Sequence, residues 1–171
     1  MRLLFEIDAK NYDPRGKIFE RPSVRAIILR DGKVGMVYSQ KYSYYKFPGG
    51  GIEFGEDHLA ALVRETREEV GLSVKPDSVR DFGYVHRLQK DYTGNAEIFV
   101  QDNFYYLCEV DNTPQEQNLD DYEADEGFML KFVPPLEAIS TNRELNHGPK
   151  DLQMIERESS VLEILIKENI I

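Results

Sequence analysis

Two spacings of apolar residues run along this chain, and they predict which segments are strands and which are helices. The apolar runs 26–30 and 33–39 flank Asp31-Gly32, a dipeptide that suits the tight type I′ turn of a β-hairpin. Side chains of different polarity alternate along residues 81–90, which places Phe82, Tyr84, His86 and Leu88 on one face of a strand. Further segments with strand character are residues 3–7, 41–47, 96–110 and 128–133.

Helical spacing marks two longer segments. From about Asp57 to Val70, apolar side chains recur on one stripe of a helix. Residues 151–169 repeat this pattern, and a short helix is expected after Pro134-Pro135. Strands around one central helix, with a second long helix near the C-terminus, predict an α/β architecture in a single domain over residues 1–171. The apolar stripe of the first helix contains Leu59, Leu62, Val63, Thr66 and Val70.

Composition narrows the classes of partner. The 171 residues are 41% hydrophobic and 30% charged, as in a globular domain, and the formal net charge is −10. The chain has no surplus of basic residues to neutralise a phosphate backbone, so long nucleic acids are not expected as partners. A small polyphosphate, bridged to the carboxylates by metal ions, is an expected partner. The N-terminal residues do not form a signal peptide and no segment has ~20 apolar residues, so no membrane association is expected. Cys108 is the only cysteine, which excludes an internal disulfide and favours a reducing, cytoplasmic location.

The predicted helix at 57–70 carries a cluster of acids. Glu65, Glu68 and Glu69 are three or four positions apart, so their carboxylates are neighbours and repel one another. A hard divalent cation such as Mg²⁺ or Mn²⁺ relieves this repulsion, because these ions prefer carboxylate oxygens. Arg64 stands one turn from Glu68 and can hold an acid in position. The alternative is a solvated acidic helix face.

A glycine-rich turn precedes this helix. Pro48-Gly49-Gly50-Gly51 leaves backbone without side chains, so a phosphate or a metal can meet peptide groups directly. Gly71 stands where a left-handed residue ends a helix.

Together these residues resemble the Nudix box of the Nudix hydrolases. The spacing is Gly50, five residues, Glu56, seven residues, and then Arg64-Glu65-Thr66-Arg67-Glu68-Glu69-Val70-Gly71-Leu72. Thr66 departs from the aliphatic residue usual in the family, but it lies in the apolar stripe, where its methyl group can pack. The resemblance implies an α/β/α sandwich with a mixed central sheet. It also implies metal-dependent hydrolysis of a nucleoside diphosphate linked to another group.

The resemblance implies roles for the acids of the box. Glu65, Glu68, Glu69 and the backbone near Gly50 would hold Mg²⁺ or Mn²⁺, with Glu65, Glu68 and Arg64 taking part in catalysis. In this family a further carboxylate commonly comes from a downstream loop. The acidic connection 112–127 offers Glu126 and Glu123, although a solvated loop explains its acids equally well.

Candidate residues for substrate binding lie outside the box. Tyr44 and Lys46 lead into the glycine turn, where the tyrosine ring could stack on a base and the lysine could contact a phosphate. The alternative is that both residues belong to an amphipathic strand and pack beneath it. Arg87 is a second candidate for phosphate binding, or an ordinary solvated strand end. The downstream proline common in ADP-ribose hydrolases and the Ser-Gln-Pro-Trp signature of NADH-type enzymes are both absent. A small nucleotide, namely a nucleoside triphosphate with oxidised ones included, is the substrate that remains.

Two other classes of function remain open. A Nudix-fold module that binds a nucleotide for regulation would not cleave it, and a degenerate box would favour this reading, whereas every acid is present here. A solvated acidic protein that uses its last helix as an interaction surface would show no metal-dependent activity. The same helix is a candidate contact with a second copy in a homodimer.

Overall fold

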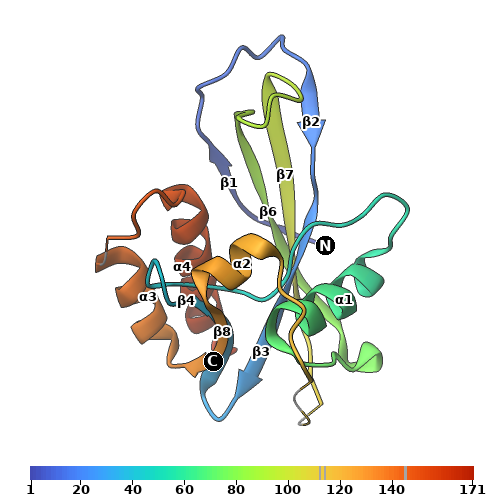
Figure 1. Cartoon of the computed structure of the whole chain (residues 1–171), viewed down its shortest axis with the longest axis vertical. Helices are drawn as coiled ribbons and strands as arrows, with labels where there is room; N and C mark the ends of the chain where they lie inside the picture. Colours follow the sequence, from blue (N-terminus) through green and yellow to red (C-terminus); the bar gives the residue numbers. More distant parts are fainter. Residues whose placement is uncertain (112, 114, 145) are drawn as a thin grey trace.

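The computed structural model describes residues 1–111, 113, 115–144 and 146–171 of the chain. In these residues a mixed eight-stranded sheet lies between helices, with strands ordered β1-β6-β7-β3-β4-β5, β2 beside β7 and β8 beside β4 (Figure 1). The pairs β1–β6, β2–β7 and β3–β7 are parallel and the others are antiparallel. The α/β/α architecture with a mixed central sheet is therefore confirmed. The strands are β1 Leu3–Asp8, β2 Ile18–Glu20, β3 Ser23–Arg30, β4 Lys33–Ser39, β5 Tyr44–Lys46, β6 Arg80–Lys90, β7 Ile98–Leu107 and β8 Phe128–Val133.

Helices cover both faces of the sheet. In Figure 1, α1 lies on one side of β3, and α3 and α4 lie on the other. Both faces of strand β3 need a covering helix, because its side chains alternate between two apolar clusters on opposite sides of the sheet. Val24, Ala26 and Ile28 pack with α1 residues such as Leu62, whereas Ile27 packs with residues of α3 and α4. The helices are α1 His58–Val70, the 3₁₀ turn η1 Pro76–Ser78, α2 Asp121–Glu126, α3 Pro135–Glu144 and α4 Leu152–Lys167.

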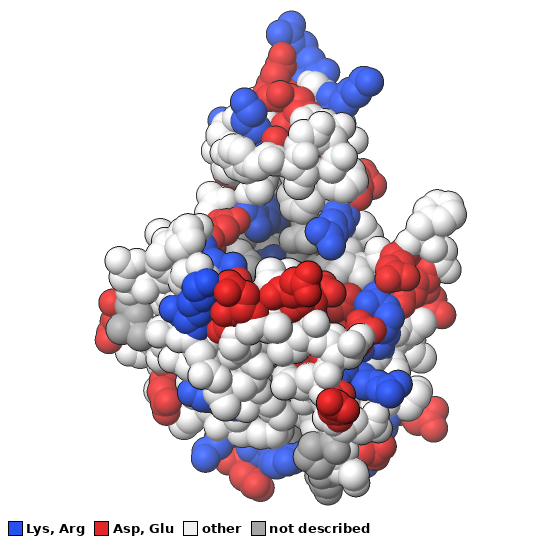
Figure 2. Space-filling view, viewed as in Figure 1, with Lys and Arg blue, Asp and Glu red and all other residues white. Residues whose placement is uncertain are grey.

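A long β6–β7 hairpin extends beyond the helices, flanked by β1 and β2 (Figure 1). Between the end of this hairpin and the helical body, the face in Figure 2 is hollowed, with a row of acidic side chains along its lower margin and basic side chains within it. The topology thus provides a recess in which charged groups of both signs are close to one another.

Several predicted elements have the expected form. Asp31 and Gly32 have φ of 51° and 71°, as a type I′ hairpin turn requires. Asp57 caps α1 and Gly71 ends it with φ 68°. Thr66 is fully buried, as its place in the apolar stripe predicts. Its Oγ1 has no hydrogen-bond partner among the residues described.

Other predictions need correction. The acidic connection 112–127 contains the helix α2, although residues 112 and 114 lie outside the described part. Leu59 is 40% exposed and does not join the core. In β6 the register shifts between Asp81 and Gly83, so the alternation changes phase: Phe82 is buried as predicted, but beyond it Val85 and Arg87 are buried instead of Tyr84, His86 and Leu88.

Side chains from the C-terminal helices bond to the backbone of β5 and the residue after it. Asn142 of α3 accepts from the Tyr45 amide at 2.8 Å and donates to the Tyr45 carbonyl at 3.0 Å. Glu158 of α4 accepts from the Phe47 amide at 3.0 Å. This chain segment leads into the glycine turn, so α3 and α4 fix where that turn lies.

The final helix buries most of its predicted stripe within the same chain. Ile155, Leu162 and Leu165 are at most 1% exposed, whereas Leu152 is 64% exposed. A homodimer through this helix stays a prediction. No helix among the described residues has the length and apolar character to cross a membrane.

Candidate active site

The glycine turn lies along β3 and is held by backbone hydrogen bonds. Val24 donates to the Gly50 carbonyl at 3.0 Å, and Ala26 donates to the Pro48 carbonyl at 2.8 Å. Gly49 has φ of 134°, and a Cβ there would lie 2.1 Å from the Val24 carbonyl oxygen. Only glycine fits this position.

Two glutamates of α1 reach this turn. The Gly49 amide donates to Glu69 Oε2 at 2.8 Å. A Cβ on Gly50 would lie 2.2 Å from Glu65 Oε2, so the missing side chain gives that carboxylate its place. The helix and the turn are thus packed against each other through carboxylates and bare backbone.

Arg64 is the centre of a hydrogen-bond cluster beside these acids. Its Nη1 donates to Glu65 Oε1 at 2.7 Å and to Glu68 Oε2 at 3.2 Å. Its Nη2 donates to the Gly51 carbonyl at 3.1 Å, and Nε and Nη2 both donate to Glu56. One planar guanidinium therefore positions two box acids and the loop before the helix.

Glu69 is the most deeply buried acid of the helix. It is 2% exposed and forms an ion pair with Lys46, whose ammonium also lies 4.8 Å from the centre of the Phe128 ring. Burial raises the pKa of Glu69, and Lys46 and Arg25 oppose this shift without cancelling it. Burial likewise raises the pKa of Glu65.

The segment before α2 closes the other side of the helix. The Asn118 amide donates to the Glu68 carbonyl at 2.8 Å, and the Gln115 amide donates to the Gly71 carbonyl at 2.7 Å. These bonds satisfy carbonyls at the end of α1 that lack helical partners.

Glu123 projects from α2 toward the same space. Its Oε2 accepts from the Asp120 amide at 3.0 Å, in a capping box, and its Oε1 accepts from the Tyr122 hydroxyl at 2.8 Å. Both carboxylate oxygens are therefore held in place.

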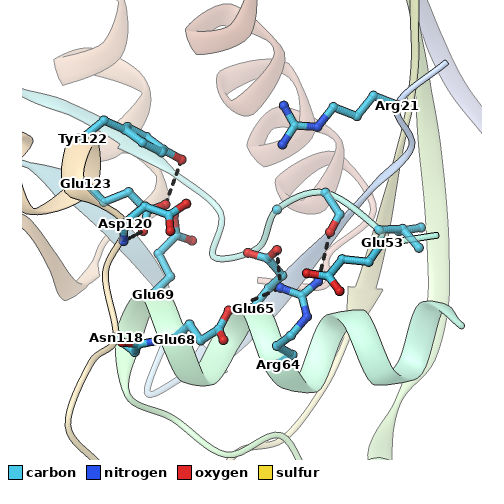
Figure 3. Close-up of a pocket in the computed structure, with 13 residues that line it drawn as sticks. Arg21, Glu53, Arg64, Glu65, Glu68, Glu69, Asn118, Asp120, Tyr122 and Glu123 are labelled. Atoms are coloured by element: carbon cyan, nitrogen blue, oxygen red, sulfur yellow. Dashed lines mark hydrogen bonds and ion pairs between the residues drawn. The ribbon is translucent and has the colours of Figure 1, made fainter. Parts of the chain in front are cut away.

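These groups line one cavity of about 470 Å³, shown in Figure 3. Among the described residues, six of its lining side chains are carboxylates and two are guanidinium groups, so negative charge is in excess. The carboxylates belong to Glu53, Glu65, Glu68, Glu69, Asp120 and Glu123, and the guanidinium groups to Arg21 and Arg64.

The sequence of residues 20–157, which is most of the chain, matches the family model of the NUDIX domain. The chain belongs to the Nudix family. It is 47% identical over 53 residues to the RNA pyrophosphohydrolase of Acinetobacter baylyi, which covers 30% of this chain and 32% of that protein. The matches to the RNA pyrophosphohydrolases span about a third of the length of those proteins.

Solved Nudix structures share the fold of this chain. A Nudix hydrolase from Nitrosomonas europaea superposes with a TM-score of 0.55 at 21% identity, covering 81% of this chain and 87% of that one. A pyrophosphohydrolase from Bacillus subtilis also gives 0.55 at 21% identity, covering 86% and 79%.

The residues expected in the Nudix box converge on the acidic cavity. Gly50, Arg64, Glu65, Glu68 and Glu69 all line it. The carbonyl of Gly50, which was expected near a metal, accepts the bond from Val24 described above.

Four other expected site residues do not line this cavity. Glu126 is 4% exposed and accepts from Ser39 Oγ and the Tyr44 hydroxyl, each at 3.0 Å, and from Lys150. Tyr44 is 2% exposed, and burial raises the pKa of its hydroxyl. Lys46 stands behind Glu69, and Arg87 pairs with Asp151 at a separate cavity.

Six of the described lining residues were not predicted as site residues: Arg21, Ile52, Glu53, Asn118, Asp120 and Tyr122. The pattern from Asp120 to Glu123 is a capping box, and this signal could have predicted α2 and the place of Glu123. Arg21 gave no local signal, because only the packing of the glycine turn brings it to the cavity.

The donor set suits a hard divalent cation, because every candidate ligand is an oxygen. Gly50 leaves room for the Glu65 carboxylate beside the turn. Among the described residues, however, no group of three acidic, histidine or cysteine side chains could hold a metal ion as arranged. Arg64 and Lys46 pair with the carboxylates of the box.

Proposed function

We propose that this Nudix protein is a metal-dependent pyrophosphohydrolase, which cleaves a phosphoanhydride bond in a nucleoside diphosphate linked to another group. The observation that carries the proposal is the cavity in which six carboxylates meet the glycine turn. Such a cavity repels a bare polyphosphate, so the substrate enters together with cations that neutralise the carboxylates and the phosphates. Membership of the Nudix family supports hydrolysis of this kind of bond.

Glu65, Glu68 and Glu69 are the proposed ligands of Mg²⁺ or Mn²⁺. A bound ion supplies charge neutralisation at the phosphoryl oxygens and a more acidic water. Arg64 sets the directions of Glu65 and Glu68, and Lys46 pairs with the buried Glu69. The protein thus supplies positioning, on which phosphoryl transfer largely depends.

Glu123 is the proposed general base, in preference to Glu126. Its carboxylate lines the cavity and is fixed by the Asp120 amide and the Tyr122 hydroxyl. Glu126 is enclosed by Ser39, Tyr44 and Lys150 and has no access to that cavity. A positioned base contributes about 10²–10⁴-fold to the rate.

The proposed substrate is a small nucleoside triphosphate, oxidised ones included. The net charge of −10 disfavours a long polyanion away from the cavity. The partial matches to RNA pyrophosphohydrolases favour a second candidate, a triphosphate at the 5′ end of RNA. A cytoplasmic location likewise stays a prediction.

A substrate panel with Mg²⁺ and Mn²⁺ tests the proposal. The panel holds nucleoside triphosphates, dinucleoside polyphosphates, nucleotide sugars, ADP-ribose and a short 5′-triphosphorylated RNA, with products separated by chromatography. Hydrolysis of one class is expected, and Glu69→Gln should abolish it. Glu163→Gln serves as the control, because Glu163 pairs with Arg143 on an exposed surface.

The same panel distinguishes the alternatives. Nucleotide binding without turnover, in wild-type protein loaded with either metal, would identify a non-catalytic regulatory module. Neither binding nor a metal-dependent change in thermal stability would leave an acidic protein without an enzymatic role.

A further inference from the structure

A second cavity, of about 370 Å³, has the opposite charge to the acidic one. In the described part of the chain, four of its lining side chains are basic and one is acidic, although the net charge of the whole chain is −10. The basic residues are Arg25, Arg87, Lys150 and Arg157, and the acid is Asp151. We call this the basic cavity.

Its arginines are buried, which is costly unless something stabilises the charge. Arg157 is 1% exposed, Arg87 is 5% exposed and Arg25 is 8% exposed. Arg157 pairs with the buried Glu158 and donates to Asn103 Oδ1 at 2.6 Å. Arg87 pairs with Asp151, at the N-terminus of α4.

These pairings do not satisfy all the donors. The buried Nε groups of Arg25 and Arg87 have no hydrogen-bond partner in the described part of the chain. Burial lowers the pKa of Arg87 despite the nearby Asp151 carboxylate, which indicates that its charge is incompletely compensated. An anion in the basic cavity would supply the acceptors and the charge that this cluster lacks.

Arg25 joins the basic cavity to the acidic one. It lines the basic cavity and donates to the carbonyl of Gly49, whose amide donates to Glu69. The glycine turn is thus shared, with carboxylates on one side and arginines on the other. A phosphorylated molecule bound at the acidic cavity therefore has a cationic site on the other side of the glycine turn.

We propose that the basic cavity binds a phosphate group through Arg25, Arg87, Lys150 and Arg157. Guanidinium groups match phosphate in geometry, since each presents several N–H donors in one plane. The group is either a phosphate of the substrate outside the cleaved bond or a free phosphate ion. The first source rests on the proposed function, whereas phosphate binding itself does not.

Calorimetric titration of inorganic phosphate into the full chain, without divalent metal, tests the proposal. Gln89→Glu is the informative variant, because Gln89 lines the cavity and already accepts a hydrogen bond from Arg87. A glutamate there keeps the contact with Arg87 and repels an anion. Wild-type protein is expected to bind phosphate, and Gln89→Glu to weaken binding about tenfold or more.

Two further variants strengthen the test. Lys150→Gln removes one cation at a partly exposed position and should also weaken phosphate binding. Arg143→Gln is the matched control, because Arg143 is ion-paired with Glu156 and Glu163 outside the basic cavity, and should bind phosphate as wild type does. Absence of binding in wild-type protein, or unchanged binding in a folded Gln89→Glu variant, would overturn the proposal.

A second titration separates the two sources of phosphate. If the cavity takes a phosphate of the substrate, a non-hydrolysable nucleoside triphosphate displaces inorganic phosphate. If the ligand is the free ion, nucleotide and phosphate bind together. Neither titration requires turnover, so phosphate binding can be tested even if the proposed hydrolysis is not observed.

Discussion

Arg64 holds Glu56 through two parallel hydrogen bonds, with Nε to Oε1 and Nη2 to Oε2 both at 2.8 Å. The two residues are eight positions apart, on α1 and on the loop before it. The same guanidinium bonds Glu65, Glu68 and the Gly51 carbonyl. One side chain therefore fixes the helix, the loop and the glycine turn relative to one another.

Replacing Arg64 by lysine should lower kcat/KM by about 10²-fold while the protein stays folded. Lysine keeps the charge but has no planar fork, so it cannot hold Glu56 and Glu65 together, and small misplacements of this kind are costly. Steady-state kinetics on the best substrate measures the effect. Arg67→Lys, on an exposed position of the same helix, should keep wild-type kinetics.

The stability that Glu56 provides should depend on pH. Its hydrogen bonds to Arg64 lower the pKa of Glu56, so the folded chain holds this proton more weakly than the unfolded chain, where the pKa is about 4.3. The stabilisation is present above that pH and disappears as the pH falls through the lowered pKa. In thermal unfolding, the Tm of wild type should exceed that of Glu56→Gln at pH 7, and the difference should shrink toward pH ~3. A difference that stays constant would contradict the assignment.

Gly50→Ala should impair activity more than stability. The added Cβ would lie 2.2 Å from Glu65 Oε2, the end of a side chain that can move away. We expect kcat/KM to fall by about 10–10²-fold, because Glu65 leaves its place beside the turn. Gly51→Ala is the control, since its Cβ would lie 3.2 Å from the Arg21 Nε and needs only a small movement. Equal losses in both variants would argue against this role of Gly50.

Cys108 should resist alkylation in the folded protein. Burial raises the pKa of its thiol to about 12, so about one thiol in 10⁴ is ionised at pH 8, whereas an unfolded thiol has a pKa of about 8.5. Raising the pH toward 10 should speed labelling of the native chain, and denaturant should speed it far more. Mass spectrometry after iodoacetamide treatment follows both effects. Rapid labelling of native protein at pH 8 would contradict the burial of this thiol.

The helix that carries the acids was predictable because its determinants are local. Asp57 and Gly71 cap its ends, and the 3.6-residue period places Leu62 and Val70 in the core. The close approach of Glu65 and Glu69 to the glycines follows from the same short segment. The sequence therefore identified the centre of the acidic cavity.

The remaining parts of the recess depend on contacts between distant segments. Arg87 lies at the basic cavity because the register shift near Gly83 changes which β6 residues face inward, and a period of two cannot reveal such a shift. Glu123 and Glu126 are both on α2, and the surroundings of that helix decide between them. The capping box and Tyr122 hold Glu123, and Ser39, Tyr44 and Lys150 enclose Glu126.

The bonds between Asn142 and Tyr45 have a consequence for association. A strand edge with free amides and carbonyls is a template on which another chain can add, a route to aggregation. The carboxamide of Asn142 occupies both backbone groups of Tyr45, so a foreign strand finds nothing to pair with there. A single side chain thereby protects the approach to the glycine turn from intermolecular sheet growth.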